Sequence, residues 1–392
     1  MTPETDPDLM SKLVCLLKDP AFFVRRAAVE RLAEFRDERV VDLLIGALGD
    51  ADDGVREHAA LGLKQLRDPK CLFPLYELWD DPGPWHRVLD EALEAIQEVG
   101  LHALDYLADA MGADDQDRAM MAAYVLGEVR HPKAVQLLLD AIHHPDPEVK
   151  IAVASGLARQ NDREARQRLL SKMEDSELPI GADAAFALAF MHERRAYRTL
   201  VAALKSNRWP QRWQAAFGLG RMIDQRSIRP LVGALMDENE WVRKGAARAL
   251  GYIGQGRWPR PKIDPAEAVQ PLIHACLHDS HPEVRAEAAY ALGQLGMREA
   301  KQPLLQLLQG DEEVEVRISA AYGLGDLEDP AATEPLISLL KHDPDPRLRY
   351  ASACALGDIR DKRAAKPLKD AILDDDPDVR VAAYAAWEEC DG

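Results

Sequence analysis

The chain lacks any segment that could enter a membrane. Its 392 residues contain no uninterrupted apolar run of about eighteen residues, the length that a membrane-spanning helix needs. The first residues, Met1 to Pro7, also lack the basic start and apolar stretch of a secretion signal. We therefore expect neither membrane contact nor secretion, and we expect the protein to work in the cytoplasm.

Cysteine and positive charge are both scarce. The five cysteines lie far apart and form no Cys-x-x-Cys pair, which fits a reducing compartment and disfavours disulfides and cysteine-only zinc sites. The formal net charge is −18, and the isoelectric point is near 5.1. Such acidity works against general affinity for nucleic acid or anionic membranes. Nucleic acid is therefore not an expected partner.

Recognisable catalytic motifs are missing as well. The chain has no glycine-rich phosphate loop, no nucleophile elbow and no catalytic triad spacing. His274 and His278 are four residues apart and share a helix face, which makes metal ligation conceivable. However, no zinc-enzyme carboxylate motif accompanies them, Cys276 between them suits a core position, and a solvated surface explains them more simply. We expect no metal, no cofactor and no catalytic residue.

What the sequence does have is one pattern that recurs twelve times at steps close to 31 residues. Each copy holds an apolar residue, a basic or variable residue, a pair of small residues and a leucine, as in Val242, Arg243, Ala246-Ala247 and Leu250. A period of this length indicates stacked two-helix units, because one unit cannot bury a core alone. The second residue of the pattern, here called the anchor, is Arg25, Arg56, His86, Ala119, Lys150, Gly181, Arg212, Arg243, Arg285, Arg317, Arg349 and Arg380.

Each unit is predicted to form helix A, a turn and helix B. A proline in the first turn of helix A, as at Pro230, costs little because that N–H needs no helical partner. Asp-Pro pairs such as Asp146-Pro147 end helix A and begin helix B. Glycines such as Gly251 and Gly293 are expected to end helix B.

The pattern predicts an all-α fold, a right-handed α-solenoid (α-α superhelix) of about twelve repeats that forms a single domain over residues 1–392. The repeats are irregular near 80–120 and 175–185. A basic, proline-rich insertion occupies 255–265 and contains Arg257, Trp258 and Arg260. Insertions in repeats map to loops that often bind partners. The alternative interpretation is a surface loop that has diverged without gaining a function.

These repeats resemble the HEAT repeat family, in particular the short-turn type found in phycobilisome lyases. The resemblance implies that the helix opening with Val-Arg lines the concave face. The small residues of helix B independently favour the same placement, because helices rich in Ala and Gly can pack closely and the more closely packed layer must be the inner one. Deoxyhypusine hydroxylase, in the wider family, holds two irons with His-Glu pairs on such helices. The matching positions here hold Met120-Met121, Ala286-Glu287 and Ile318-Ser319, so we expect that chemistry to be absent.

At 100° per residue, positions −1, +3, +7 and +10 from the anchor form the core stripe of helix B. Positions +1, +5 and +9 face the other way, into the concave groove. Nine aromatic residues fall on that row, far more than chance would place there, and Arg and Lys accompany them. Aromatic and Arg side chains dominate binding interfaces. The predicted groove residues are Tyr124, Phe186, Phe190, Trp213, Phe217, Arg221, Lys244, Arg248, Tyr252, Tyr290, Tyr322 and Tyr350.

Two functions remain open for such a groove. The first is a non-enzymatic scaffold, adaptor or assembly factor that binds a protein partner there. The second is a phycobilin lyase or chromophore chaperone, because aromatic rings with charged neighbours could seat a flat tetrapyrrole. A third possibility is that the rings only seal the inner layer by packing between neighbouring helices.

Overall fold

The computed structural model describes residues 7–35, 37–80, 89–113, 115–175, 180–254 and 264–391. Throughout these ranges the regular structure is helical, and no strand occurs in them, as the repeat predicts. The helices alternate between two layers. The A helices are α1 (Pro7–Leu16), α3 (Glu38–Ala47), α5 (Leu72–Asp80), α7 (Leu104–Met111), α9 (Pro132–Asp140), α11 (Arg163–Asp175), α13 (Ala196–Ala203), α15 (Ile228–Ala234), α17 (Ala266–His278), α19 (Lys301–Gly310), α21 (Thr333–His342) and α23 (Ala365–Ala371).

The B helices are mostly longer than the A helices, and they carry eleven of the twelve anchors, while His86 lies outside the described residues. Short 3-10 turns, such as Gln225–Ser227 and Pro330–Ala332, lead into several of the A helices. The B helices are α2 (Phe22–Leu32), α4 (Asp53–Leu66), α6 (Leu89–His102), α8 (Gln116–Glu128), α10 (Pro147–Gln160), α12 (Ile180–Phe190), α14 (Trp209–Met222), α16 (Glu240–Gly254), α18 (Pro282–Leu295), α20 (Val314–Asp326), α22 (Pro346–Ile359) and α24 (Pro377–Asp391).

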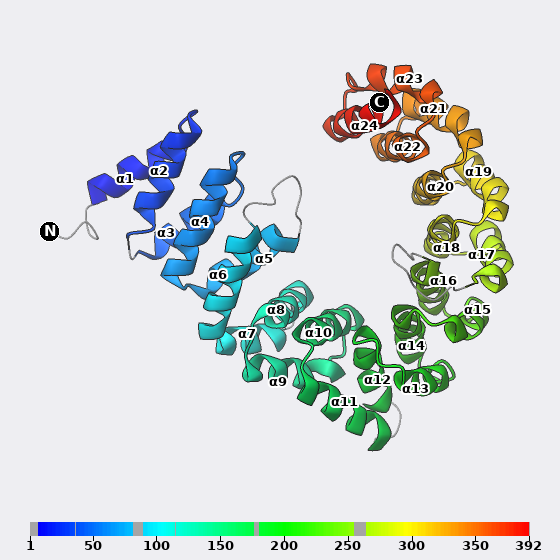
Figure 1. Cartoon of the computed structure of the whole chain (residues 1–392), viewed down its shortest axis with the longest axis horizontal. Helices are drawn as coiled ribbons and strands as arrows, with labels where there is room; N and C mark the ends of the chain where they lie inside the picture. Colours follow the sequence, from blue (N-terminus) through cyan, green and yellow to red (C-terminus); the bar gives the residue numbers. More distant parts are fainter. Residues whose placement is uncertain are drawn as a thin grey trace. The chain divides into compact units, whose positions relative to one another are not determined.

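The chain divides into two compact units, unit 1 (Met1–Asp175) and unit 2 (Ser176–Gly392). Within unit 2, Figure 1 shows α14 to α24, counted by even numbers, on the inner side of an arc and the A helices on its outer side. The helices that open with Val-Arg therefore line the concave face of unit 2, as predicted. That the repeats of both units form one continuous domain stays a prediction.

The predicted core stripe is confirmed in the regular repeats. On α16, Val242, Ala246, Leu250 and Ile253 are all buried, and the matching residues of α18 are buried too. Aspartates cap the B helices as the Asp-Pro pairs indicate, since Asp146 accepts hydrogen bonds from the backbone N–H groups that open α10. The stack is thus held by an apolar seam between A and B helices.

The expectation that Gly251 and Gly293 end helix B is wrong, although another glycine, the left-handed Gly296 (φ 66°), does end α18. Gly251 and Gly293 lie inside α16 and α18, which continue to Gly254 and Leu295. The glycines instead allow neighbouring B helices to touch: a Cβ on Gly220 would lie 2.6 Å from the Cα of Ala249 in the next repeat. Several B helices end at a residue whose backbone adopts the left-handed conformation. Most of these residues are not glycine, as with Ile223 (φ 51°).

The anchor arginines join one repeat to the next, a role that the sequence pattern did not reveal. Arg243 Nε and Nη2 donate to both oxygens of Asp279 at 2.7 and 2.9 Å, and Nη1 donates to the backbone carbonyl of Asp237 at 2.9 Å. Both side chains of the pair are mostly buried. We call this arrangement the arginine clasp. It recurs as Arg25–Asp50, Arg212–Asp237, Arg285–Asp311 and Arg349–Asp374.

The clasps lower the pKa of their aspartates. The hydrogen bond from Arg349 holds the pKa of Asp374 below its ordinary value, and the hydrogen bond from Arg25 does the same for Asp50. Each clasp reaches from helix B of one repeat to the A–B turn of the following repeat, so it ties neighbouring repeats together.

None of the helices in the described ranges is long and apolar enough to cross a membrane.

Candidate functional site

The predicted groove residues of unit 2 lie on α12, α14, α16, α18, α20 and α22, and they divide into a buried group and an accessible group. The division follows position along the stack. Phenylalanine and tryptophan occupy the first helices, and tyrosine occupies the later ones.

The rings on α12 and α14 form a closed cluster instead of the open strip that the sequence predicted. Phe186, Phe190, Trp213 and Phe217 are each exposed by 7% or less. Their ring centroids lie 5.2 to 6.2 Å apart, and Trp213 also rests against Gly245 of the next helix. The expectation that these four rings face solvent is wrong, because the helices approach closely enough for large rings to interlock across them.

The tyrosines on α18, α20 and α22 remain accessible. Tyr290 is 38% exposed, Tyr350 is 37% exposed, and Tyr322 between them is half-buried. Burial raises the pKa of Tyr322 to about 12, with Cys354, Tyr350 and Tyr290 contributing. The three tyrosines offer aromatic area with a polar edge, which suits a binding surface.

A pocket of about 510 Å³ opens between α16, α18 and α20, where the two groups meet. It contains four of the predicted residues: Lys244, Arg248, Tyr252 and Tyr290. The sequence pattern missed its other polar lining, since these side chains lie at positions −2 and +2 from the anchor or on the groove row without an aromatic ring. They include Glu283, Glu287, Gln294, Glu315 and Ser319.

The cations of this face differ in their partners. Arg248 donates to both oxygens of Glu287 at 3.0 and 2.8 Å, so its charge is matched within the pocket wall. Arg221 instead lies over the rings of Phe190 and Tyr252, 4.8 and 5.8 Å from their centroids. Lys244 lies over the ring of Trp241 at 5.2 Å.

Tyr124 lies on α8 in unit 1, so it is described apart from the tyrosines of unit 2. It is half-buried and stacks on Tyr76, with centroids 5.6 Å apart and an interplanar angle of 6°. Arg159 lies over both rings. Arg257, Trp258 and Arg260 of the insertion lie outside the described residues, so their predicted contribution to binding stays a prediction.

No group of three or more His, Cys, Asp or Glu side chains that could hold a metal ion occurs in the described part of the chain. The rings of His274 and His278 do approach each other, with centroids 5.0 Å apart at the end of α17. Two imidazoles alone do not complete the four-ligand set of a structural zinc site.

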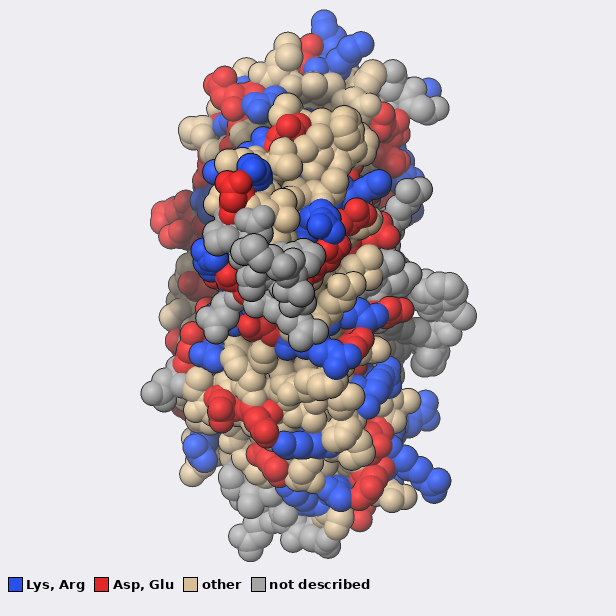
Figure 2. All heavy atoms as spheres, turned by 90° about the vertical axis from the view of Figure 1, so that its left-hand side faces the viewer, with Lys and Arg blue, Asp and Glu red and all other residues tan. Residues whose placement is uncertain are grey.

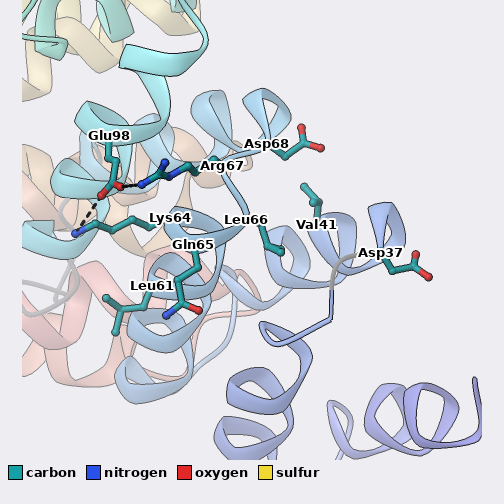
Figure 3. Close-up of a pocket in the computed structure, with 9 residues that line it drawn as sticks. All are labelled: Asp37, Val41, Leu61, Lys64, Gln65, Leu66, Arg67, Asp68 and Glu98. Carbon is teal, nitrogen blue, oxygen red and sulfur yellow. Dashed lines mark hydrogen bonds and ion pairs between the residues drawn. The ribbon is translucent and has the colours of Figure 1, made fainter. Parts of the chain in front are cut away.

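Unit 1 has an open hollow of about 820 Å³ near α3 and α4, drawn in Figure 3. Among its charged side chains, Lys64 and Arg67 both reach Glu98, whereas Asp37 and Asp68 point away from them. Asp68 accepts a hydrogen bond from the backbone N–H of Lys70. The two cations of the hollow are thus paired with Glu98, and its apolar lining is limited to Val41, Leu61 and Leu66.

Basic and acidic side chains are interspersed over the face drawn in Figure 2, with no broad area of one sign. A protein that binds nucleic acid through its phosphates needs a continuous basic surface. This face does not provide one.

The helix pairs stack in two layers, and in unit 2 the inner layer lines a concave face. This arrangement defines an α-solenoid. The sequence profile of HEAT repeats matches residues 5–63, 46–126, 104–189, 197–262, 257–313 and 302–387. The chain belongs to the HEAT repeat family. No curated protein matches the sequence.

Solved structures share the repeat at low identity. An engineered protein (target OR497) is 22% identical over 98% of this chain and 99% of its own, with a TM-score of 0.38. Kap121p is 16% identical over 98% of this chain and 46% of its own, with a TM-score of 0.48. The CpcE–CpcF complex of phycocyanin lyase from Nostoc sp. PCC7120 is 21% identical over 57% of this chain and 94% of that chain, with a TM-score of 0.38.

Proposed function

We propose that the chain is a non-enzymatic protein-binding scaffold, adaptor or assembly factor, and that its binding surface is the concave face of unit 2 from α16 to α22. A HEAT-repeat solenoid is a scaffold fold that typically binds proteins. The observation that carries the proposal is the row of accessible tyrosines, one on each of three successive inner helices. A solenoid needs no such rings for its core.

The surface has the composition of an interface centre. Tyr290 and Tyr252 line the pocket of about 510 Å³, and this pocket can receive one large side chain of a partner. Charged side chains surround it, so polar contacts would fix the direction of the bound segment. The buried cluster adjoins the pocket wall, since the rings of Phe217 and Tyr252 lie 5.9 Å apart. We expect this binding to occur in the cytoplasm, where the five free cysteines would remain reduced.

Site-specific photo-crosslinking tests this surface. A crosslinking amino acid at Ser319 in the pocket should capture the partner, whereas the same amino acid at Gln270 on the exposed outer side of α17 should not. With the partner identified, Tyr290→Ala should weaken binding by about tenfold, a usual interface effect. Tyr384→Ala removes a tyrosine that is 49% exposed on α24 outside this row, so it serves as the matched control.

Two outcomes would contradict the proposal. Capture from Gln270 but not from Ser319 would move the binding surface to the outer layer. Tight binding of a bilin that depends on Tyr290 would instead favour a chromophore chaperone, and absorption spectroscopy would detect it.

A further inference from the structure

Arg221 is a cation without a matching anion in the described part of the chain. It makes no ion pair or hydrogen bond there, and its Nε is buried without an acceptor. Its guanidinium lies between Phe190 on α12 and Tyr252 on α16. An uncompensated, partly desolvated charge is costly, so a residue of this kind points to a missing partner.

Unit 1 shows what that partner is. Arg159 occupies the same +9 position as Arg221 and also lies over two rings, those of Tyr76 and Tyr124. Its Nη1, however, donates to Glu128 at 2.7 Å and to the Tyr76 hydroxyl at 2.8 Å. Glu128 is the +9 residue of the preceding repeat, and in unit 2 that position holds Phe190. The chain therefore contains a closed and an open version of one arrangement.

We infer that Arg221 receives a carboxylate from the partner, and that the bound segment carries Asp or Glu at this point. The inference rests on the proposed function, because it names the chemistry of the partner for the same concave face. Lys244 on the neighbouring helix contacts the Trp241 ring and has no ion pair among the described residues, so it adds a second positive charge beside the pocket.

The rest of the face determines how such a segment lies. Glu283 at the pocket and Asp326 and Asp358 on α20 and α22 are exposed carboxylates that repel a second acidic group. The acidic residue of the partner therefore lies at α14 and α16. Uncharged or basic residues follow along Tyr290, Tyr322 and Tyr350. Charge thus fixes the direction of the chain in the groove.

Peptide selection on the full-length protein tests the inference. Short random peptides displayed on phage are selected on the wild-type protein, and the enriched peptides are synthesised with Asp or Glu and with the matching amide. The peptides should be enriched in Asp or Glu. Arg221→Met should reduce their affinity about tenfold or more, the range for a charged hydrogen bond in an interface. The amide peptide should lose the same amount, and the two losses should not add.

Stability provides a second readout. Met fills the space between Phe190 and Tyr252 without a charge, so Arg221→Met should keep or raise the melting temperature. Arg229→Met on α15 is the control, because that side chain is 85% exposed on the outer layer and should not affect the peptides. A melting temperature that falls by several degrees would make Arg221 a structural residue and overturn the inference.

The remaining outcomes separate the inference from the proposed function. If selected peptides lose affinity on Tyr290→Ala but not on Arg221→Met, the groove binds proteins and the inference about Arg221 is wrong. If selection yields no peptide, both are contradicted. If a single-stranded oligonucleotide binds in an Arg221-dependent manner and acidic peptides do not, the anion is a phosphate and the acidic segment is excluded.

Discussion

Phe217 lies at the centre of the ring cluster in unit 2. It contacts Phe186, Phe190, Trp213 and Tyr252, with centroids 5.6 to 6.2 Å away, and it is only 5% exposed. Tyr350 follows the same groove row but is 37% exposed. Two aromatic residues of one predicted class thus have different roles.

Phe217→Ala should reduce the free energy of unfolding by about 3 kcal/mol or more, because it leaves a cavity among four rings. Tyr350→Ala should reduce it by less than about 1 kcal/mol, as for most exposed positions. Urea denaturation of both variants measures the difference. Equal losses would mean that the accessible tyrosines also serve as packing residues.

The sequence placed every one of these residues on its helix but could not separate the buried rings from the accessible ones. Helical periodicity gives the direction of a side chain from its own axis. The burial of Trp213 depends on Gly245 in the next repeat, because a Cβ there would lie 2.9 Å from Cδ1 of the indole. Whether a ring is buried thus depends on a pair of residues on two helices, and the periodicity of a single helix does not contain that information.

Among the elements, the arginine clasp has a natural control within the chain. Arg243 clasps Asp279, whereas Arg317 donates only to the backbone carbonyls of Asp311 and Glu312 within the described residues. Both are anchors of regular repeats. Comparing them isolates the side-chain ion pair from the backbone contacts.

Arg243→Gln should lower the free energy of unfolding by about 2 to 3 kcal/mol, since it leaves the mostly buried Asp279 without its charged partner. Arg317→Gln should cost about 1 kcal/mol, the value of ordinary hydrogen bonds. Denaturant melts of the two variants provide the measurement. An equal effect would show that the carboxylate adds nothing to the backbone contacts.

The clasps also predict how stability depends on pH. The pKa values of Asp50, Asp279, Asp311 and Asp374 are lowered in the folded chain. A carboxylate of this kind binds its proton more readily when unfolded, so its contribution is complete well above the unfolded pKa of about 3.9. That contribution is lost as pH falls from there through the folded pKa. Helical circular dichroism should show acid unfolding below about pH 4, and Asp374→Asn should make the loss shallower.

Two glycines test the close approach of the B helices. A Cβ on Gly220 would lie 2.6 Å from the Cα of Ala249, whereas a Cβ on Gly233 in α15 meets nothing within 4 Å. Gly220→Ala should destabilise by about 1 to 3 kcal/mol through overpacking. Gly233→Ala should stabilise by about 0.4 to 1 kcal/mol, because alanine restricts the unfolded chain. Thermal melts compare them, and destabilisation of similar size in both would refute the close approach at Gly220.

For the molecule as a whole, the repeat period predicted the class, the two layers and the core stripe. It did so because each unit satisfies local rules of apolar spacing and capping that a sequence displays directly. The division into unit 1 and unit 2 was not predicted, although its boundary at Asp175 and Ser176 lies close to the irregular repeat at Gly181. An irregular anchor shows where the repeat pattern is interrupted, but it does not show that the chain divides into two units there.

Removing one whole repeat should preserve the fold. Deletion of residues 318–349 joins Arg317 to Tyr350, so the first part of α20 continues into the last part of α22 in the same register. Stability in a repeat stack comes from each unit and its neighbours, so the shortened chain should remain helical and unfold cooperatively. Circular dichroism and a thermal melt check this. A molten, non-cooperative product would show that stability depends on contacts beyond neighbouring repeats.

The small residues between the B helices also determine the radius of the concave face in unit 2. The inner helices approach backbone to backbone at pairs such as Gly220–Ala249 and Gly325–Ala355. The outer helices, which carry leucine and isoleucine, are spaced by larger side chains. Curvature follows from this difference in thickness between the two layers, so a methyl group added on the inner side opens the arc by a small angle at that step. Single substitutions of these small residues can therefore change the width of the groove in small increments during evolution, without altering any residue that touches a partner.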